Sequence, residues 1–296
     1  MAELQATPAA TAARLDWRPV ALGLTGVLVF SLTLPATKLA LVSMSPIFIG
    51  LGRAVVAGAP AAVALAVTRQ RLPRADQWRR LLVVAVGVVV GFPLCSALAL
   101  GHLSSAHGAV VVGLLPLSTA CFAVLRAGER PSRRFWVACS AGSALVVAFA
   151  LSQGLGGDSA WDGMLVLAVL LGGLGYAEGA VLARELGGWQ VICWALVLAA
   201  PFLLVPVALA APQHGVDAPA WLGFAYVSLG SMFLGFFAWY RAMAMAGVAR
   251  ISQLQLLQPP LTLVWSALLL GDGVGPLTVA AGLGVIVCVA AAQRSR

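Results

Sequence analysis

The stretch Ala249–Asp272, ARISQLQLLQPPLTLVWSALLLGD, is long enough to cross a bilayer but is not uniformly apolar. It contains Gln253, Gln255 and Gln258, and the proline pair Pro259-Pro260 follows directly. Polar side chains and helix breaks are tolerated at membrane depth where they face protein or a water-filled cavity. The stretch therefore predicts a membrane helix that lines a transport pathway.

Composition places the rest of the chain in the membrane as well. Hydrophobic residues make up 61% of the 296 positions and charged residues 9%, whereas a soluble domain is about a quarter charged. Successive apolar runs predict an all-α, polytopic integral membrane protein. The net charge of +8 fits basic cytoplasmic loops, because no basic-aromatic module for nucleic acid is present. The five cysteines lie in apolar runs without a CxxC pair, so neither a metal nor a cofactor is predicted.

Ten membrane spans are predicted, at residues 20–41, 46–67, 81–100, 107–125, 135–151, 163–182, 191–211, 221–240, 251–270 and 276–292. Most approach the roughly 20 residues that a bilayer requires. Arginines concentrate in alternate connections, and none lies in segments 42–45, 101–106, 152–162, 212–220 and 271–275. This bias places both termini in the cytoplasm. We therefore expect a multi-pass protein of a bacterial-type cytoplasmic (inner) membrane.

An internal repeat appears when the sequence is shifted along itself until Trp78 meets Trp221. The same displacement, which we call the repeat shift, aligns Gly87 with Gly230, Pro116 with Pro259, and Glu129 with Asp272. Five spans in each unit make the second unit inverted relative to the first, a common plan of secondary transporters. The predicted organisation is a cytoplasmic segment 1–19, repeats 20–151 and 163–292 joined by an external linker 152–162, and a tail 293–296. Ala106–Glu129 is then the counterpart of Ala249–Asp272.

Several motifs resemble the drug/metabolite transporter superfamily, specifically its ten-helix EamA type. They are GVLVFSLTLPATKLA at 26–40, SPIFIGLGRAV at 45–55, SAHGAVVVGLLPL at 105–117 with AGER at 127–130, and ISQLQLLQPPL at 251–261 with LGD at 270–272. Phe30 departs from the tryptophan that many members have. The resemblance covers essentially the whole chain and implies two five-helix bundles around a central cavity. Within the family, the chain is most similar to YddG-like amino-acid exporters.

Three charged residues are predicted to lie at membrane depth. Glu178, within LLGGLGYAEGAVLA, is a candidate proton carrier or ammonium-binding group. Its structural alternative is a carboxylate paired with Arg184 or with a neighbouring helix. Lys38 is interpreted as snorkelling to the headgroups. Arg53 is interpreted as an ion pair or a hydrogen-bond donor to helix-end carbonyls, with an outer gate or a carboxylate-binding site as the alternative.

The Ala249–Asp272 helix offers a polar face rather than a single residue. Spacing of three and four residues puts Ser252, Gln255, Pro259, Thr262 and Ser266 on one side, with Gln258 adjacent. Amides suit a zwitterionic or neutral polar substrate. The predicted substrate-binding residues are Phe30, Ser31, Ser96, Tyr176, Glu178, Trp239, Gln255, Gln258, Thr262 and Trp265. The predicted hinges are Pro35, Pro116, Pro259 and Pro260. Interhelical hydrogen bonding and bundle packing are the structural alternatives.

The sequence thus predicts an alternating-access carrier that exports small metabolites, foremost amino acids, through a central cavity. A proton-coupled exporter of cationic drugs, with Glu178 binding the cation, is the first alternative. A membrane-embedded enzyme is the second, but it needs a cluster of His, Asp or Ser at a membrane face, and none is visible. An uncoupled channel is a further alternative. The predicted partners are a small-molecule substrate, the bilayer and, through Glu178, protons. Ten helices suffice for a monomer.

Overall fold

The computed structural model describes residues 17–152 and 159–270 and a few positions between 280 and 291. Within these residues the chain is helical and contains no strand. The first repeat comprises α1 (Arg18–Ser31), α2 (Thr33–Leu41), α3 (Pro46–Val67), α4 (Ala75–Val84), η1 (Ala85–Gly91), α5 (Phe92–Leu100), α6 (Ser105–Val112), α7 (Leu115–Ala127) and α8 (Arg133–Ser152). The second comprises α9 (Ser159–Leu186), α10 (Gly188–Leu209), α11 (Ala218–Ala225), η2 (Tyr226–Gly235), α12 (Phe236–Ala246), α13 (Val248–Ser252), η3 (Gln253–Leu257) and α14 (Gln258–Leu270).

Six stretches are long and apolar enough to cross a membrane: Arg18–Leu41, Pro46–Val67, Ala75–Leu100, Ala160–Leu186, Gly188–Leu209 and Ala218–Ala246. Shorter apolar helices, such as Leu115–Ala127, accompany them. The predicted span 276–292 and both terminal segments lie largely outside the described residues. The observed helices extend beyond several predicted ends. α9, for example, begins inside the expected linker, and Asp162 in its first turn complements the positive end of the helix dipole.

Five of the predicted spans that the structure describes are interrupted, and four of these interruptions precede a proline; the exception is 221–240, which η2 interrupts. Pro35 lies in the first turns of α2 after a break at Leu32, and Pro116 lies at the start of α7. Pro93 opens α5 after η1, and Pro259 follows the 3₁₀ segment η3 at the start of α14. Proline removes a backbone donor and clashes with the preceding turn, so regular α-helix ends before it. The structure thus places a helix break beside every predicted hinge.

The two π-helices occupy equivalent positions in the two repeats. The repeat shift carries η1, Ala85–Gly91, onto 228–234, which lies inside η2, Tyr226–Gly235. It also carries the break between α6 and α7 onto the end of η3. A π-turn inserts an extra residue into the helical ladder, and such turns occur frequently at functional sites. The repeat is therefore visible in local backbone irregularities as well as in sequence.

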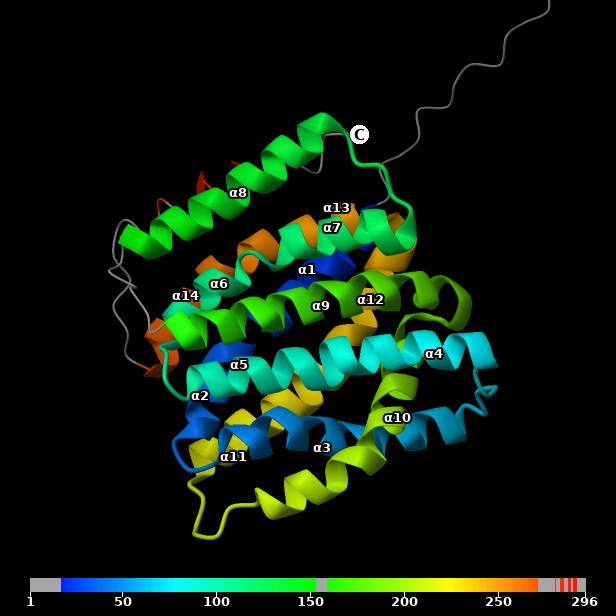
Figure 1. Ribbon diagram of the computed structural model, residues 1–296, viewed down its shortest axis with the longest axis vertical. Coiled ribbons are helices and arrows are strands. Elements are labelled where there is room, and N and C mark those ends of the chain that lie inside the picture. Colours follow the sequence, from blue (N-terminus) through cyan, green and yellow to red (C-terminus); the bar gives the residue numbers. More distant parts are fainter. Residues whose placement is uncertain are drawn as a thin grey trace, which may run out of the picture.

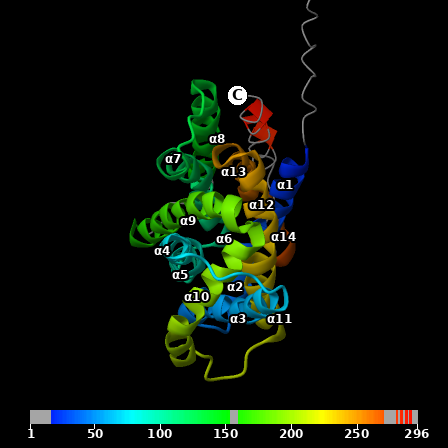
Figure 2. The same cartoon turned by 90° about the vertical axis from the view of Figure 1, so that its right-hand side faces the viewer.

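Figure 1 shows the helices stacked along the long axis of the molecule, with α8 at one end and α10 and α11 near the other. α9 lies between them and packs on α4, α5 and α7, so a helix of the second half is embedded in the first. α6 packs on α14 and α7 on α13, so the two predicted counterparts, Ala106–Glu129 and Ala249–Asp272, run antiparallel and in contact. In Figure 2, α4 and α5 lie on the left of the molecule, and α1, α12 and α14 lie on its right.

Candidate functional site: a small cavity between the repeats

A cavity of about 20 Å³ lies between helices of both halves of the chain. Such a volume holds about one water molecule, whereas ligand pockets measure roughly 300 Å³ or more. In this conformation the cavity is therefore too small for a ligand larger than water and would have to widen to hold one. The wall is formed by Phe30, Thr33, Leu34, Arg53, Val88, Phe92, Tyr176, Ser231, Phe236 and Gln258.

Residues that are equivalent in the two repeats line the cavity together. The repeat shift pairs Thr33 with Tyr176 and Val88 with Ser231, and all four residues line the cavity. Secondary transporters with inverted repeats place their substrate at the interface between the repeats.

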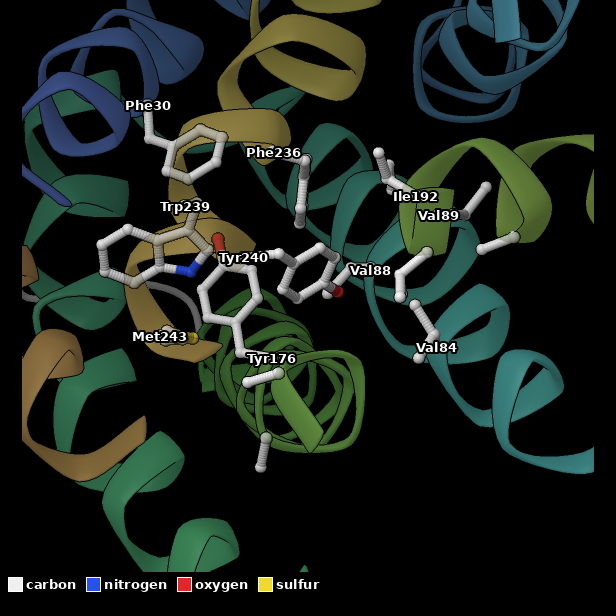
Figure 3. Close-up of a cluster of buried hydrophobic side chains, with 14 of the residues drawn as sticks. Phe30, Val84, Val88, Val89, Tyr176, Ile192, Phe236, Trp239, Tyr240 and Met243 are labelled. Atoms are coloured by element: carbon white, nitrogen blue, oxygen red, sulfur yellow. The ribbon is translucent and has the colours of Figure 1, made fainter. Parts of the chain in front are cut away.

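An aromatic cluster, Phe30, Tyr176, Phe236, Trp239 and Tyr240, forms one side of the cavity. Phe30 contacts Tyr176, Phe236 and Trp239 at centroid distances of 6.3, 5.2 and 5.9 Å. Figure 3 shows these rings gathered around Tyr176, with contributions from α1, α9 and α12. The Tyr240 hydroxyl donates to Gly175 O over 3.1 Å. The cluster gives the site a rigid, mainly apolar wall.

Arg53 is the cationic group of the cavity wall and is only 4% exposed. Its Nη2 donates to Ser231 Oγ over 3.0 Å, and the same oxygen lies 2.8 Å from Thr33 Oγ1. Its Nε is buried without a hydrogen-bond partner, and no salt bridge reaches it from the described residues. A buried charge without a counter-ion is costly. Within the described part of the chain, Arg53 thus lacks the ion pair that was one of the sequence-based interpretations.

Two glutamines at the break before α14 also have unpaired polar atoms. Gln258 lines the cavity, and its Oε1 is buried without a hydrogen-bond partner. Gln255 is 2% exposed, and neither polar atom of its amide has a partner with hydrogen-bond geometry, although the Tyr176 hydroxyl approaches it. Gln255 does not line the present cavity. Buried amides normally find partners, so these atoms are available to a ligand or to another conformation.

Two hydroxyl groups of the predicted polar face, those of Thr262 and Ser266, are instead used between helices, whereas that of Ser252 donates to Ala249 O. Thr262 Oγ1 donates to Ser31 O over 2.7 Å, and Trp265 Nε1 donates to Ser31 Oγ over 2.9 Å. These contacts join α14 to α1. Ser266 Oγ lies 2.8 Å from Ser105 Oγ of α6, and Ser96 Oγ donates to Pro93 O of its own helix. The structure thus brings Ser31, Thr262 and Trp265 together as an interhelical group and leaves Ser96 apart.

Glu178 lies at one end of the bundle, away from the cavity wall. Its two carboxylate oxygens are paired with Nε of Arg80 on α4 and, over 2.7 Å, Nε of Arg126 on α7. Arg80 also contacts Glu185 over 2.8 Å. These partners come from neighbouring helices, which is one of the structural alternatives expected from sequence. Arg184 contacts Glu129 instead. Substrate or proton binding by Glu178 stays a prediction.

Glu129 joins the two halves at the same end of the bundle. Its carboxylate accepts from Val248 N over 2.7 Å and from Ala249 N over 2.8 Å, at the first turn of α13. Gly247, at φ 93°, opens that helix beside the carboxylate. An anion at a helix N-terminus satisfies unpaired amides and complements the dipole. We call this contact the Glu129 latch.

The opposite end contains a larger cavity of about 480 Å³, which Lys38 lines together with the start of α3 and the turn after α5. Lys38 Nζ donates to Leu100 O, at the end of α5, over 2.8 Å. Lys38 thus satisfies a helix-end carbonyl. On the same end, His107 of α6 is paired with Asp162 of α9. Lys38 lies one helical turn beyond Leu34, which lines the smaller cavity.

Of the predicted substrate-binding residues, the cavity wall includes Phe30, Tyr176 and Gln258, and Trp239 packs behind it. Thr33, Leu34, Val88, Phe92, Ser231 and Phe236 were not among the predicted site residues. Applying the repeat shift to positions already chosen would have found Thr33, which is the counterpart of Tyr176. No local signal identifies Ser231 before its π-helix is known.

The helical fold, the cavity lined by repeat-equivalent residues and the apolar spans are those of a membrane transporter. A family model of the EamA-like transporter family matches the chain twice, over residues 17–151 and 159–292. The chain therefore belongs to the EamA-like transporter family, within the drug/metabolite transporter superfamily. The family and the relatives below are transporters, not enzymes.

Two relatives extend over most of the chain. "Uncharacterized transporter YdeK" of Bacillus subtilis (strain 168) is 50% identical over 92% of this chain and 96% of its own length. A "Probable terminal-alkyne amino-acid exporter" of Streptantibioticus cattleyicolor is 30% identical over 88% of each chain. A crystal structure of another protein, 17% identical, superposes with a TM-score of 0.76 over 93% of this chain and 98% of that chain, which shows a shared fold.

Proposed function

We propose that this transporter exports amino acids across a cytoplasmic (inner) membrane by alternating access. In this proposal, ten spans form two inverted five-helix repeats, residues 20–151 and 163–292, with both termini in the cytoplasm. The observation that carries the proposal is the cavity wall itself, to which repeat-equivalent residues contribute from both halves. Rocking of one half against the other would open that space to alternate sides.

The chemistry of the wall favours amino acids over cationic drugs. The charged residue at the cavity is Arg53, which repels a cationic ligand. Glu178, which a cation exporter would need, has each oxygen paired with an arginine. The name of the Streptantibioticus cattleyicolor relative, an amino-acid exporter, points in the same direction.

The helix breaks supply the mobility that alternating access needs. Breaks precede Pro35, Pro116 and Pro259, and the helices of Pro35 and Pro259 supply residues of the cavity wall. Hinges are commonly a few element-terminal residues that absorb backbone rotation. The Glu129 latch would close the cytoplasmic side in the conformation described.

Counterflow into proteoliposomes tests this function. Full-length protein is reconstituted with an internal amino acid, and uptake of labelled neutral, aromatic and charged amino acids is compared with uptake of cationic dyes. We expect exchange of neutral and aromatic amino acids, with no uptake into protein-free vesicles. Exchange of a cationic dye without exchange of any amino acid would instead establish the cation-exporter alternative.

A further inference from the structure

We propose that Arg53 binds the carboxylate of the transported molecule and that Gln258 Oε1 accepts a hydrogen bond from its ammonium group. The ligand is then an α-amino acid with a neutral, apolar side chain. This assignment rests on the proposed transport function and names the substrate class of the same cavity.

The first step of the argument is the state of Arg53. The side chain is more than nine-tenths buried and lines the cavity, and its Nε has no hydrogen-bond partner within the described residues. A guanidinium has five N–H donors in a planar fork that matches a carboxylate. Ser231, itself contacted by Thr33, uses one of these donors and holds the group in place. An incoming carboxylate would supply both the missing charge and the missing acceptor.

The second step concerns the amine. Among the described residues, no carboxylate lines the cavity, so an ammonium has no counter-ion among them. The unpaired buried acceptor of the wall is Gln258 Oε1. An amide oxygen accepts from an ammonium without demanding a full countercharge. Arg53 and Gln258 line the same cavity of about 20 Å³, so a ligand seated there meets both groups.

The third step concerns the side chain of the ligand. The rest of the wall is mainly apolar and includes Phe30, Leu34, Val88, Phe92 and Phe236. An apolar side chain gains free energy on entering such surroundings, whereas an additional charge would be left unpaired. Acidic and basic amino acids are therefore disfavoured.

The experiment compares binding of four related ligands to the full-length protein in nanodiscs by calorimetry. Norleucine has both groups, hexanoate lacks the amine, norleucinamide lacks the carboxylate, and pentylamine lacks the carboxyl group altogether. We expect norleucine to bind most tightly, hexanoate to bind measurably, and the last two to bind at least about tenfold more weakly than norleucine.

Variants assign the preference to residues. Arg53→Gln should weaken norleucine and hexanoate by about 10- to 100-fold and erase the preference over norleucinamide. Arg53→Lys, which keeps the charge but loses the fork, should fall between. Gln258→Leu should weaken norleucine but leave hexanoate unchanged. Arg130→Gln, at an exposed arginine, serves as the control and should bind like the wild type.

The unfolding temperature of the ligand-free variants separates a binding role from a structural one. If Arg53 only supports the fold, Arg53→Gln lowers that temperature; if it awaits a ligand, the temperature is unchanged or higher. Equal affinity for norleucine and norleucinamide, or undiminished affinity in Arg53→Gln, overturns the assignment even if amino-acid exchange is observed. Carboxylate-selective binding that depends on Arg53, without exchange of any amino acid, refutes the proposed transport function alone.

Discussion

Removal of the Glu129 latch should shift the transporter towards a form open to the cytoplasm. In Glu129→Ala, two backbone N–H groups of α13 lose charged acceptors at 2.7 and 2.8 Å. Loss of a helix-capping acceptor costs roughly 1 kcal/mol, so the closed form loses about 2 kcal/mol relative to an open form in which water already solvates these groups. That difference corresponds to about 30-fold in the open population.

Cysteine accessibility measures this population. Val88 lines the cavity and is buried, so Val88→Cys is labelled by an impermeant maleimide from the cytoplasmic side only when that side opens. The five native cysteines are first replaced. We expect labelling up to about 30-fold faster with Glu129→Ala and about fivefold faster with Glu129→Gln, which keeps one acceptor oxygen.

The matched control is Arg130→Gln, which changes the charge of the neighbouring exposed residue and should leave the labelling rate unchanged. Labelling of Glu129→Ala no faster than that of the parent would refute the latch. Equal acceleration by Arg130→Gln would also refute it, because the effect would then come from net charge at this end of the bundle.

Two further predictions concern the packing of α9. Gly179→Ala should destabilise the protein by about 1–3 kcal/mol, because the added methyl group would overlap the Tyr240 ring; Gly163→Ala, in open space on the same helix, is its control. Arg80→Gln should lower the unfolding temperature in detergent, because it breaks contacts with two carboxylates of α9. Substitution of the exposed Arg79 should have no such effect.

The features that sequence predicted well are those encoded by residue type and period. Apolar runs marked the long helices, and the predicted hinge prolines Pro35, Pro116 and Pro259 lie just after interruptions of α-helix, whereas Pro60, Pro201 and Pro206 lie inside continuous helices. The repeat shift predicted opposite directions for Ala106–Glu129 and Ala249–Asp272, and the packing of α6 on α14 and of α7 on α13 agrees with it, although the contact itself was not predicted. The first two inferences need only local physical chemistry, namely the thickness of a bilayer and the missing backbone donor of proline. The third needs only a comparison of the sequence with itself.

Side-chain contacts between segments far apart in the sequence were harder to predict from the sequence. Arg184 was one candidate partner for Glu178, but residues six apart on a helix point to different sides, and those three or four apart face each other. The actual partners, Arg80 and Arg126, come from α4 and α7. The same limit applies to Thr262, whose helical spacing indicated a polar face but not that Ser31 would occupy it, and to Trp265, whose indole also donates to Ser31.

The asymmetry between the repeats bears on how one substrate is held through the transport cycle. The repeat shift pairs Arg53 with Leu196 and Gln258 with Leu115, and both leucines are buried apolar residues. A symmetric cavity would offer a zwitterion two equivalent orientations. With one guanidinium on α3 and one unpaired amide oxygen on α14, a zwitterion gains both contacts in one orientation alone. The repeat symmetry would then serve the motion, whereas recognition of the substrate would depend on the positions at which the symmetry is broken.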